Sequence, residues 1–280
     1  MKYGIYLSNF GKDISARSLA NLAEEAERVG WDGFFLWDQI LGSKSNRLPM
    51  VDPWVALTAM AMKTEQIRLG TTVTPLARRR PWKLARETVT LDHLSEGRLT
   101  ICVGLGDPPD AEFSHFGEEA DPRIRAKKLD EGLEILTGLW SGQTFEFRGE
   151  HFSIEKTVFR PPVYQSPRIP IWVGGFWPNK APFRRAAHWD GAFPLKSGSK
   201  MTGKDLQEIR AYIEQHREST GHFDLVMMGY SPGDDHGKAA KILRPYIAAG
   251  LTWWLESLFR EKNSYSDMLS RIRQGPPVGH

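Results

Sequence analysis

Residues 67–107 form one complete strand–helix–strand pattern, which constrains the fold more than any other stretch of the chain. Two short apolar runs, Ile67–Val73 and Leu99–Val103, flank a helical pattern over Trp82–Leu94. Both runs end in turn-forming residues, Thr-Pro after the first and Gly-Leu-Gly-Asp after the second. A helix between two such strands is typical of a parallel α/β sheet, in which ligands bind at the carboxyl ends of the strands.

The same alternation extends through most of the 280 residues and predicts a (β/α)8 TIM barrel. We find about eight short apolar runs that alternate with helical patterns, which is the number that a closed barrel needs. Pro108 and Pro109 interrupt the alternation, and it resumes at Ile171. We therefore expect one domain over residues 1–280, with an insertion at about 108–170 after the fourth strand. The insertion and the polar loop Gly42–Met50 are expected to shape the substrate pocket.

Charge and cysteine content exclude several classes of protein. The net charge of +3 is small and its charges are interspersed, so no nucleic-acid surface is indicated. The single cysteine, Cys102, excludes an intramolecular disulfide and fits a reducing compartment. We see neither an N-terminal leader nor an apolar run of about 18 residues, so we expect a soluble cytoplasmic protein without membrane contact.

Two adjacent glycines give a specific expectation for anion binding. Gly174 and Gly175 follow a predicted strand over Ile171–Val173 and precede a predicted helix over Pro178–His188. Glycines let a backbone approach a ligand closely, and a helix amino end offers free N–H groups to a phosphate. A tight turn that merely fits the barrel is an equally good interpretation.

Three carboxylates lie at predicted strand ends, namely Asp38, Asp107 and Glu256. They suit acid–base catalysis if burial raises the pKa of one of them, and otherwise they cap loops or pair with arginines. The basic run Arg78–Arg80 suits a phosphate or an acidic ligand tail, although such runs are more often solvated.

Several catalytic motifs are missing from the sequence. Gly104-Leu-Gly106 is not followed by a helix, so it is no dinucleotide fingerprint. The histidines show no spacing typical of metal ligands, and we expect no metal site. The chain has neither a GxSxG elbow nor a P-loop, which disfavours a hydrolase with a covalent nucleophile.

The segment Leu69–Asp107, followed by Phe116-Gly117, resembles the luciferase-like monooxygenase superfamily. That superfamily contains FMN-dependent monooxygenases and deazaflavin F420-dependent dehydrogenases and reductases. Further similar motifs lie in order along the chain, at Gly30–Gly33, Pro170–Gly175, Asp190-Gly191 and Gly275–Pro277. The resemblance covers nearly the whole chain and implies a (β/α)8 barrel with an insertion after the fourth strand.

The resemblance also implies a place for the cofactor. The ring is expected over the end of the third strand, on a bulge with a non-proline cis peptide within Thr71–Val73. Gly174 and Gly175 are expected to hold the cofactor phosphate. The full set of expected cofactor contacts is Asn9, Thr71, Thr72, Val73, Gly104, Gly174, Gly175 and Phe176. Asp38, Gln39 and Asp107 are expected around the reactive face, as the catalytic residues.

Gln39 departs from the pattern of the F420 branch, in which the second strand commonly ends in Asp-His. Glutamine donates and accepts hydrogen bonds but cannot take a proton near neutral pH. We therefore expect hydride transfer or oxygen chemistry in which Gln39 orients the substrate or a ring carbonyl. FMN is the favoured cofactor and F420 the alternative.

The expected partners are a small-molecule substrate and a separate flavin or F420 reductase, and the expected assembly is a homodimer or larger. Two functions from other classes stay open. One is a non-catalytic flavin-binding homologue, and the other is a barrel hydrolase that uses Asp38, Asp107 or Glu256.

Overall fold

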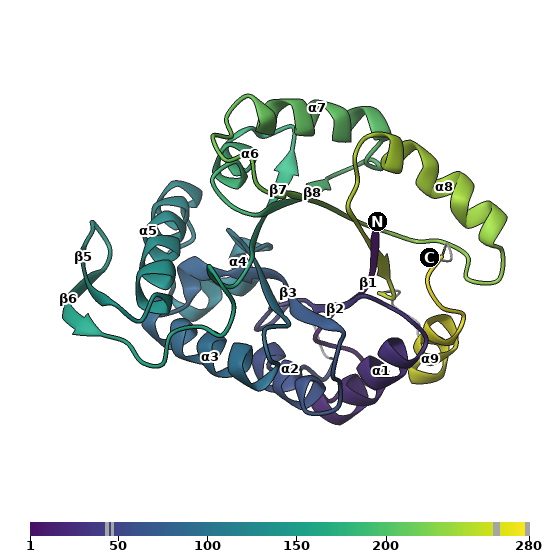
Figure 1. Cartoon of the computed structure of the whole chain (residues 1–280), viewed down its shortest axis with the longest axis horizontal. Coiled ribbons are helices and arrows are strands. Elements are labelled where there is room, and N and C mark those ends of the chain that lie inside the picture. The colour runs from purple at the N-terminus through teal and green to yellow at the C-terminus, as the bar shows by residue number, and fades with distance from the viewer. Residues whose placement is uncertain (43–44, 46–47, 260–263, 278–280) are drawn as a thin grey trace.

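Eight parallel strands close into a barrel that helices surround (Figure 1). The computed structural model describes residues 1–42, 45, 48–259 and 264–277. Neighbouring strands pair around the barrel in the order β1-β10-β9-β8-β7-β4-β3-β2, so the predicted barrel is confirmed. Its strands are β1 (Lys2–Leu7), β2 (Gly33–Leu36), β3 (Arg68–Pro75), β4 (Leu99–Gly104), β7 (Ile171–Trp177), β8 (Gly191–Lys196), β9 (Asp224–Gly229) and β10 (Trp253–Ser257).

The helices begin where the local sequence provides capping groups. Ser15 and Thr202 form capping boxes at the starts of α1 and α7, and Asp52 caps α2 ahead of a proline at its first turn. Gly30 follows α1 with a φ of 90°, as expected for a C-terminal glycine. The outer helices are α1 (Ala16–Arg28), α2 (Pro53–Ala61), α3 (Pro81–Leu94), α5 (Pro122–Trp140), α6 (Ala181–Ala186), α7 (Gly203–Glu214), α8 (His236–Ala248) and α9 (Tyr265–Arg273). Shorter helical turns are η1 (Leu76–Arg78), α4 (Pro109–Glu112) and η2 (Ser114–Phe116).

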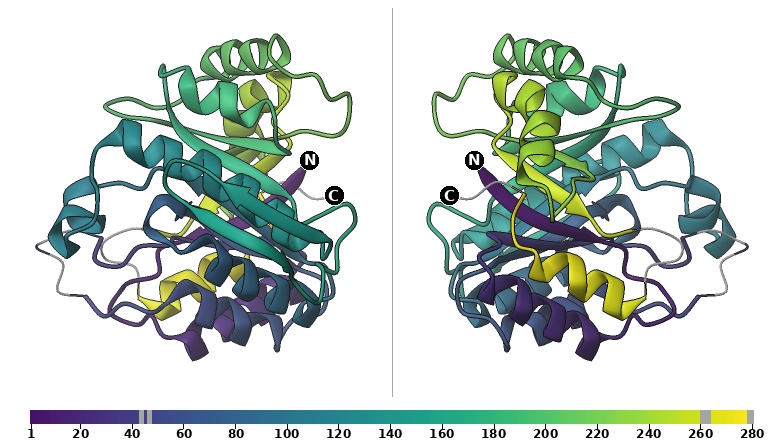
Figure 2. Two further views of the ribbon diagram at one scale, coloured as in Figure 1. Left: turned by 90° about the vertical axis from the view of Figure 1, so that its left-hand side faces the viewer. Right: turned by 90° about the vertical axis from the view of Figure 1, so that its right-hand side faces the viewer.

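The segment between β4 and β7 occupies the place of the expected insertion. Its helix α5 lies beside α3 in the outer ring (Figure 1). The indole of Trp140 in α5 donates a hydrogen bond of 2.9 Å to the Thr88 hydroxyl of α3. The apolar stripe of Leu129, Leu133 and Leu136 is fully buried, which explains this position. The hairpin of β5 (Thr144–Arg148) and β6 (Ser153–Val158) projects from the ring (Figure 1) and faces the viewer in the left view of Figure 2.

Strand β7 is longer than the sequence suggested, and this corrects the expected glycine turn. Gly174 and Gly175 lie inside the strand and pair with Phe193 and Pro194 of β8. A Cβ atom on Gly175 would lie 2.2 Å from Pro182 Cβ, so packing of the following segment requires glycine there. The helix expected from Pro178 shortens to the six residues of α6.

Large side chains fill the interior of the barrel. Its inner cluster consists of Tyr6, Phe35, Cys102, Trp172, Phe193, Val226, Trp253 and Leu255. Burial raises the pKa of the Cys102 thiol, so this side chain serves as a small apolar residue rather than a nucleophile. No helix among the described residues is long and apolar enough to span a membrane.

A substitution at Gly70 in β3 tests how tightly β3 and β4 pack against each other. A Cβ atom at this position would lie 2.1 Å from the Thr100 carbonyl oxygen in β4, which is backbone and cannot rotate away. We predict that Gly70→Ala lowers the free energy of unfolding by about 3 kcal/mol or more. Urea denaturation measures this change.

Gly221→Ala provides the control, because Gly221 is exposed and the nearest atom to its added methyl group is 3.4 Å away. We expect that variant to stay within about 0.5 kcal/mol of the unmodified protein. Equal stabilities of the two variants would contradict the strand spacing described for β3 and β4.

Candidate active site

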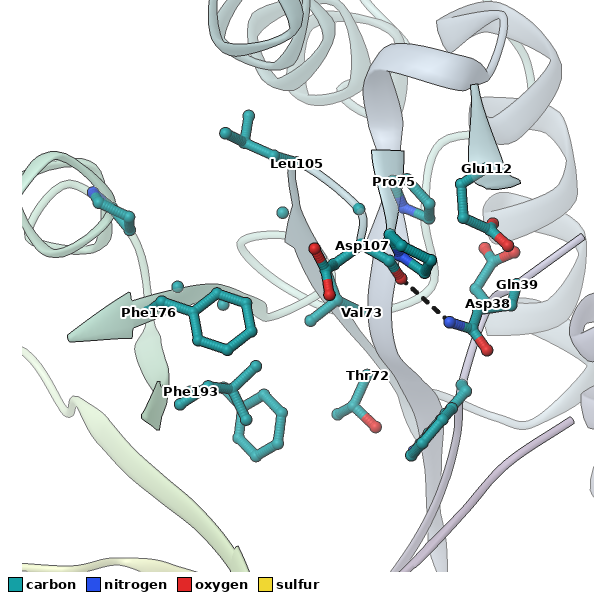
Figure 3. Close-up of a pocket in the computed structure, with 18 of the residues that line it drawn as sticks. Asp38, Gln39, Thr72, Val73, Pro75, Leu105, Asp107, Glu112, Phe176 and Phe193 are labelled. Carbon is teal, nitrogen blue, oxygen red and sulfur yellow. Dashed lines mark hydrogen bonds between the residues drawn. The ribbon is translucent and has the colours of Figure 1, made fainter. Parts of the chain in front are cut away.

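A cavity of about 400 Å³ lies at the carboxyl ends of the barrel strands (Figure 3). This is the end of a TIM barrel where ligands bind, and the volume falls in the range of small-molecule sites. Its walls come from the ends of β1, β2, β3, β4, β7 and β8. The apolar part of the lining includes Tyr6, Trp37, Val73, Leu105, Phe176, Phe193 and Leu195.

A bulge near the end of β3 forms one wall of this cavity. The Thr72–Val73 peptide bond is cis, which confirms the expectation for Thr71–Val73. The pairing of β3 with β4 shifts register between Thr71 and Thr74. A Cβ atom on either Gly104 or Gly174 would lie 2.6 Å from a methyl group of Val73. These two glycines therefore make room for the Val73 side chain, which lines the cavity.

Asp38 holds this bulge from behind. Its carboxylate accepts hydrogen bonds from Thr74 Oγ1 at 2.9 Å and from Trp54 Nε1 at 3.1 Å. Arg79 donates a third, of 2.6 Å, to the other carboxylate oxygen. The Thr74 hydroxyl also lies 2.7 Å from that of Thr71, so the bond network spans the bulge. Asp38 lines the cavity but is only 1% exposed, and it ties the end of β2 to the bulge of β3 and to α2.

The basic run Arg78–Arg80 was expected either to meet an anionic ligand or to be solvated, and two of its three side chains do neither. Arg78 pairs with Glu112 at 3.2 Å and donates to the Asp38 carbonyl oxygen at 3.0 Å. Burial lowers the pKa of Arg78, and the carboxylates of Asp38 and Glu112 oppose that shift. Arg78 and Arg79 are therefore held in ion pairs, with side chains that are 6% and 16% exposed, and Arg80 is the exposed member of the run.

Glu112 and Arg125 are structural parts of the site that the sequence analysis missed. The fully buried Glu112 carboxylate accepts hydrogen bonds from the backbone N–H groups of residues 40, 41 and 42. Arg125 donates to the carbonyl oxygens of Leu105 and Gly106 at 2.9 and 3.0 Å. Neither residue belongs to a recognisable motif, so spacing alone could not have identified them. The polar loop Gly42–Met50 was also expected to shape the pocket, and its residues 43–44 and 46–47 lie outside the described residues.

Gln39 and Asp107 meet at the polar side of the cavity. Gln39 Nε2 donates a hydrogen bond of 3.0 Å to the backbone carbonyl oxygen of Asp107 (Figure 3). Gln39 Oε1 is buried and has no hydrogen-bond partner in the described part of the chain. The Asp107 side chain is exposed and lines the cavity. Asn9 fixes the Gln39 backbone by donating to its carbonyl oxygen at 2.8 Å.

Most of the expected site residues line this cavity, namely Asp38, Gln39, Thr72, Val73, Gly104, Asp107, Gly174, Gly175 and Phe176. Asn9 and Thr71 do not, and their expected contact with the cofactor stays a prediction. Both side chains are fully buried, because their polar atoms are hydrogen-bonded to the protein behind the cavity wall.

The three strand-end carboxylates do not form an acid–base pair. Glu256 does not line the cavity, and its carboxylate is bonded to Ser231, Trp254 and Arg271. Because Asp38 is also held in ion pairs, Asp107 alone of the three presents an exposed carboxylate to the cavity.

The site combines features that fit a flavin-type ring. Such a ring is flat and apolar on its faces, while its edge carries hydrogen-bonding nitrogen and oxygen atoms. Val73 offers an apolar surface, and three buried polar atoms of lining residues, Trp37 Nε1, Gln39 Oε1 and Thr72 Oγ1, have no hydrogen-bond partner among the described residues. Buried polar atoms without a partner are costly, so their presence indicates that a ligand completes the site.

Two curated relatives differ in how much of their length the chain matches. It is 28% identical over 256 residues to an F420-dependent glucose-6-phosphate dehydrogenase of Nakamurella multipartita, which covers 86% of this chain and 73% of that protein. It is 33% identical over 162 residues to the uncharacterized protein y4wF of Sinorhizobium fredii. That second match covers 57% of this chain and only 45% of the relative.

Two solved structures share the fold over nearly the whole chain. An F420-dependent secondary alcohol dehydrogenase in complex with an F420–acetone adduct has a TM-score of 0.80 at 15% identity, covering 99% of this chain and 98% of that one. The monooxygenase RslO1 from Streptomyces bottropensis has a TM-score of 0.76 at 21% identity, covering 98% and 97%. The family model described as luciferase-like monooxygenase matches residues 1–273. The chain therefore belongs to the luciferase-like monooxygenase family, whose members are flavin- or F420-dependent oxidoreductases and monooxygenases.

Proposed function

We propose that the protein is an oxidoreductase that binds FMN at the β3 bulge and acts on a small organic substrate. The observation that carries this proposal is the bulge itself, where Val73 lines the cavity next to Thr72 Oγ1, a buried atom without a hydrogen-bond partner among the described residues. Bound FMN would supply the hydride or oxygen transfer, which no side chain can perform alone.

Residues of the chain would hold the two ends of the cofactor. Thr72 and Val73 would contact the ring, and Gly175, Phe176 and Asn179 line the cavity where β7 ends and would receive the phosphate end. The glycines of β7 would contribute through strand backbone rather than through a helix amino end.

Other lining residues would prepare the reaction without exchanging protons. Tyr6 and Phe193 are buried aromatic residues that exclude water from the cavity floor. Burial also raises the pKa of the Tyr6 hydroxyl, which keeps it neutral. Gln39 would position a ligand by a hydrogen bond, because an amide does not act as a base.

The ion pairs of Arg78 and Arg79 are the reason for preferring FMN. An acidic tail like that of F420 needs accessible cations, and these two guanidinium groups are paired with Asp38 and Glu112. Exposed Arg80, which lines a second pocket with them, is the cation that an F420 tail would meet. F420 is the second candidate, since relatives that match most of this chain are named for F420-dependent reactions. A cytoplasmic location, a separate reductase and a homodimer or larger assembly are further parts of the proposal.

Titration with FMN and with F420 tests the cofactor. We predict saturable binding of FMN, with a change in the visible spectrum of the ring and weaker binding of F420. Stronger binding of F420 would reverse the choice of cofactor, and binding of neither would refute the proposed function. A ring that binds but is reduced in no assay would favour the non-catalytic homologue.

Phe176→Glu tests the place of the phosphate end. Phe176 lines the cavity and is 42% exposed, so the substitution should leave the fold intact while adding a negative charge. We predict that FMN binds at least about tenfold more weakly, through repulsion of like charges. Val158→Glu is the control, since Val158 is 53% exposed on the β5–β6 hairpin. Equal FMN affinity in both variants would remove the phosphate assignment.

Asp38→Asn tests whether the buried carboxylate supports the bulge. Loss of its charge leaves Arg79 without its closest partner and weakens the environment of Arg78, so we predict a loss of about 3–5 kcal/mol of unfolding free energy. FMN affinity should fall as well, since Thr74 loses its fixed acceptor.

The matched control is Asp130→Asn, which breaks an ion pair with Arg185 in which the Asp130 side chain is 59% exposed. An exposed pair contributes at most about 1 kcal/mol. Urea denaturation compares the two variants, and equal losses would show that Asp38 does not support the site.

A further inference from the structure

We infer that Gln39 and Asp107 select the substrate, and that it is a neutral or cationic molecule with an O–H or N–H group rather than a carboxylate or a phosphate ester. The inference rests on the proposed function, because it places the substrate beside the cofactor in the same cavity. It concerns the polar side of the cavity, where both residues lie (Figure 3).

The Gln39 amide has one allowed orientation. Its Nε2 donates to the Asp107 carbonyl oxygen at 3.0 Å, and rotating the amide would place two acceptors against each other. Asn9 holds the backbone on both sides of the side chain, donating to the Gln39 carbonyl oxygen and accepting from its N–H at 3.4 Å. Gln39 Oε1, which has no partner among the described residues, is therefore a fixed acceptor. A ligand can satisfy it only with a hydrogen-bond donor.

Asp107 adds a second acceptor at the same place. Its backbone carbonyl orients Gln39, while its exposed carboxylate lies in the cavity. No ion pair within 4.0 Å joins this carboxylate to a cation in the described ranges. An ionised carboxylate accepts hydrogen bonds and repels other anions, so it favours the same ligands as Gln39 Oε1.

The nearby cations offer little to an anionic substrate. Arg125 is the one described cation that lines this cavity, and its Nη1 is occupied by the carbonyl oxygens of Leu105 and Gly106. Its Nε donates to the Ala120 carbonyl oxygen at 3.1 Å, and its guanidinium stacks 4.7 Å from the ring centre of Phe113. No hydrogen bond within the described residues engages Arg125 Nη2, so the Arg125 charge moderates the field of Asp107 and leaves one nitrogen, not a bidentate pair, for an anion.

Another cation near the strand ends is also engaged. Lys196, at the end of β8, donates to both carboxylate oxygens of Asp205 at 2.8 and 2.9 Å and does not line the cavity. Exposed Arg80 lines a neighbouring pocket that shares Gln39 but does not line this cavity. A carboxylate or phosphate entering the polar side would thus lose its hydration while the cations of the cavity itself already have partners.

The apolar lining defines the rest of the substrate. Tyr6, Trp37 and Phe193 present aromatic surface, and Leu195 adds an aliphatic one. The buried Trp37 Nε1 has no hydrogen-bond partner among the described residues and is a donor for an acceptor atom of the ligand. The class that fits both the polar side and this lining is a small aromatic or alicyclic alcohol, amine or amide.

Three probes of nearly equal size test this selection, namely benzyl alcohol, benzaldehyde and benzoate. Their affinities can be measured through tryptophan fluorescence, because Trp37 lines the cavity, with the protein alone and with FMN bound. We expect benzyl alcohol to bind about fivefold more tightly than benzaldehyde, which cannot donate. We expect benzoate to bind at least about tenfold more weakly than benzyl alcohol. Equal affinities for benzyl alcohol and benzoate would overturn the inference.

Asp107→Asn isolates the carboxylate, since it keeps the backbone carbonyl that orients Gln39. We expect the affinity for benzoate to rise about tenfold in this variant, because the repulsion between the two carboxylates is removed. The control Glu118→Gln removes the same charge from an exposed residue that does not line the cavity, and it should change benzoate affinity less than about twofold. Equal effects of the two substitutions would mean that net charge, not Asp107, sets the selection.

Gln39→Leu isolates the fixed acceptor and should abolish the preference for benzyl alcohol over benzaldehyde. A preserved preference in a variant with an unchanged urea midpoint would overturn the role of Gln39. If neither FMN nor F420 binds, the proposed function fails, while the probe selectivity of the protein alone still tests the two residues. Selectivity that disappears when FMN binds would assign Gln39 and Asp107 to the cofactor and refute the inference.

Discussion

The buried carboxylate of Asp38 is the interaction on which the site depends. It joins β2, the β3 bulge and α2 through Thr74, Trp54 and Arg79. A carboxylate that is 1% exposed is tolerated only because cations and donors surround it. The arrangement explains why the arginine run after β3 is buried: two of its members compensate charges beneath the cavity instead of meeting a ligand.

Close packing shapes the wall above this network. Val73 fits between Gly104 and Gly174, where any larger residue would collide with its methyl groups. The glycines therefore act on the cavity indirectly, by letting three neighbouring strands bring one valine to the wall. Interiors this dense transmit small changes, so the position of Val73 depends on β4 and β7 as well as on its own strand.

The sequence predicted those features that local patterns determine. Periodicity located the barrel strands and most outer helices, and Ser15 and Asp52 cap α1 and α2 at their starts. The resemblance placed the cis peptide in the β3 bulge. Features that depend on long-range packing could not be predicted from local patterns. One is the length of β7, which continues through the expected turn at Gly174 and Gly175, where Gly175 packs closely against Pro182. For the same reason no local pattern marked Glu112, whose partners lie about seventy residues away along the chain.

The orientation of a single amide connects this fold to its chemistry. The residue that follows Asp38 at the end of β2 could act as a base, as a hydrogen-bond donor or as an acceptor. The amide of Gln39 excludes a base but leaves both hydrogen-bonding roles open. The structure decides between the other two, because the loop after β4 brings the Asp107 carbonyl oxygen to Gln39 Nε2. The barrel thereby converts an amide that could do either into an acceptor alone. Selectivity at this site therefore depends on backbone geometry. A glutamine placed in another cavity would not select hydrogen-bond donors unless a backbone carbonyl oriented its amide in the same way.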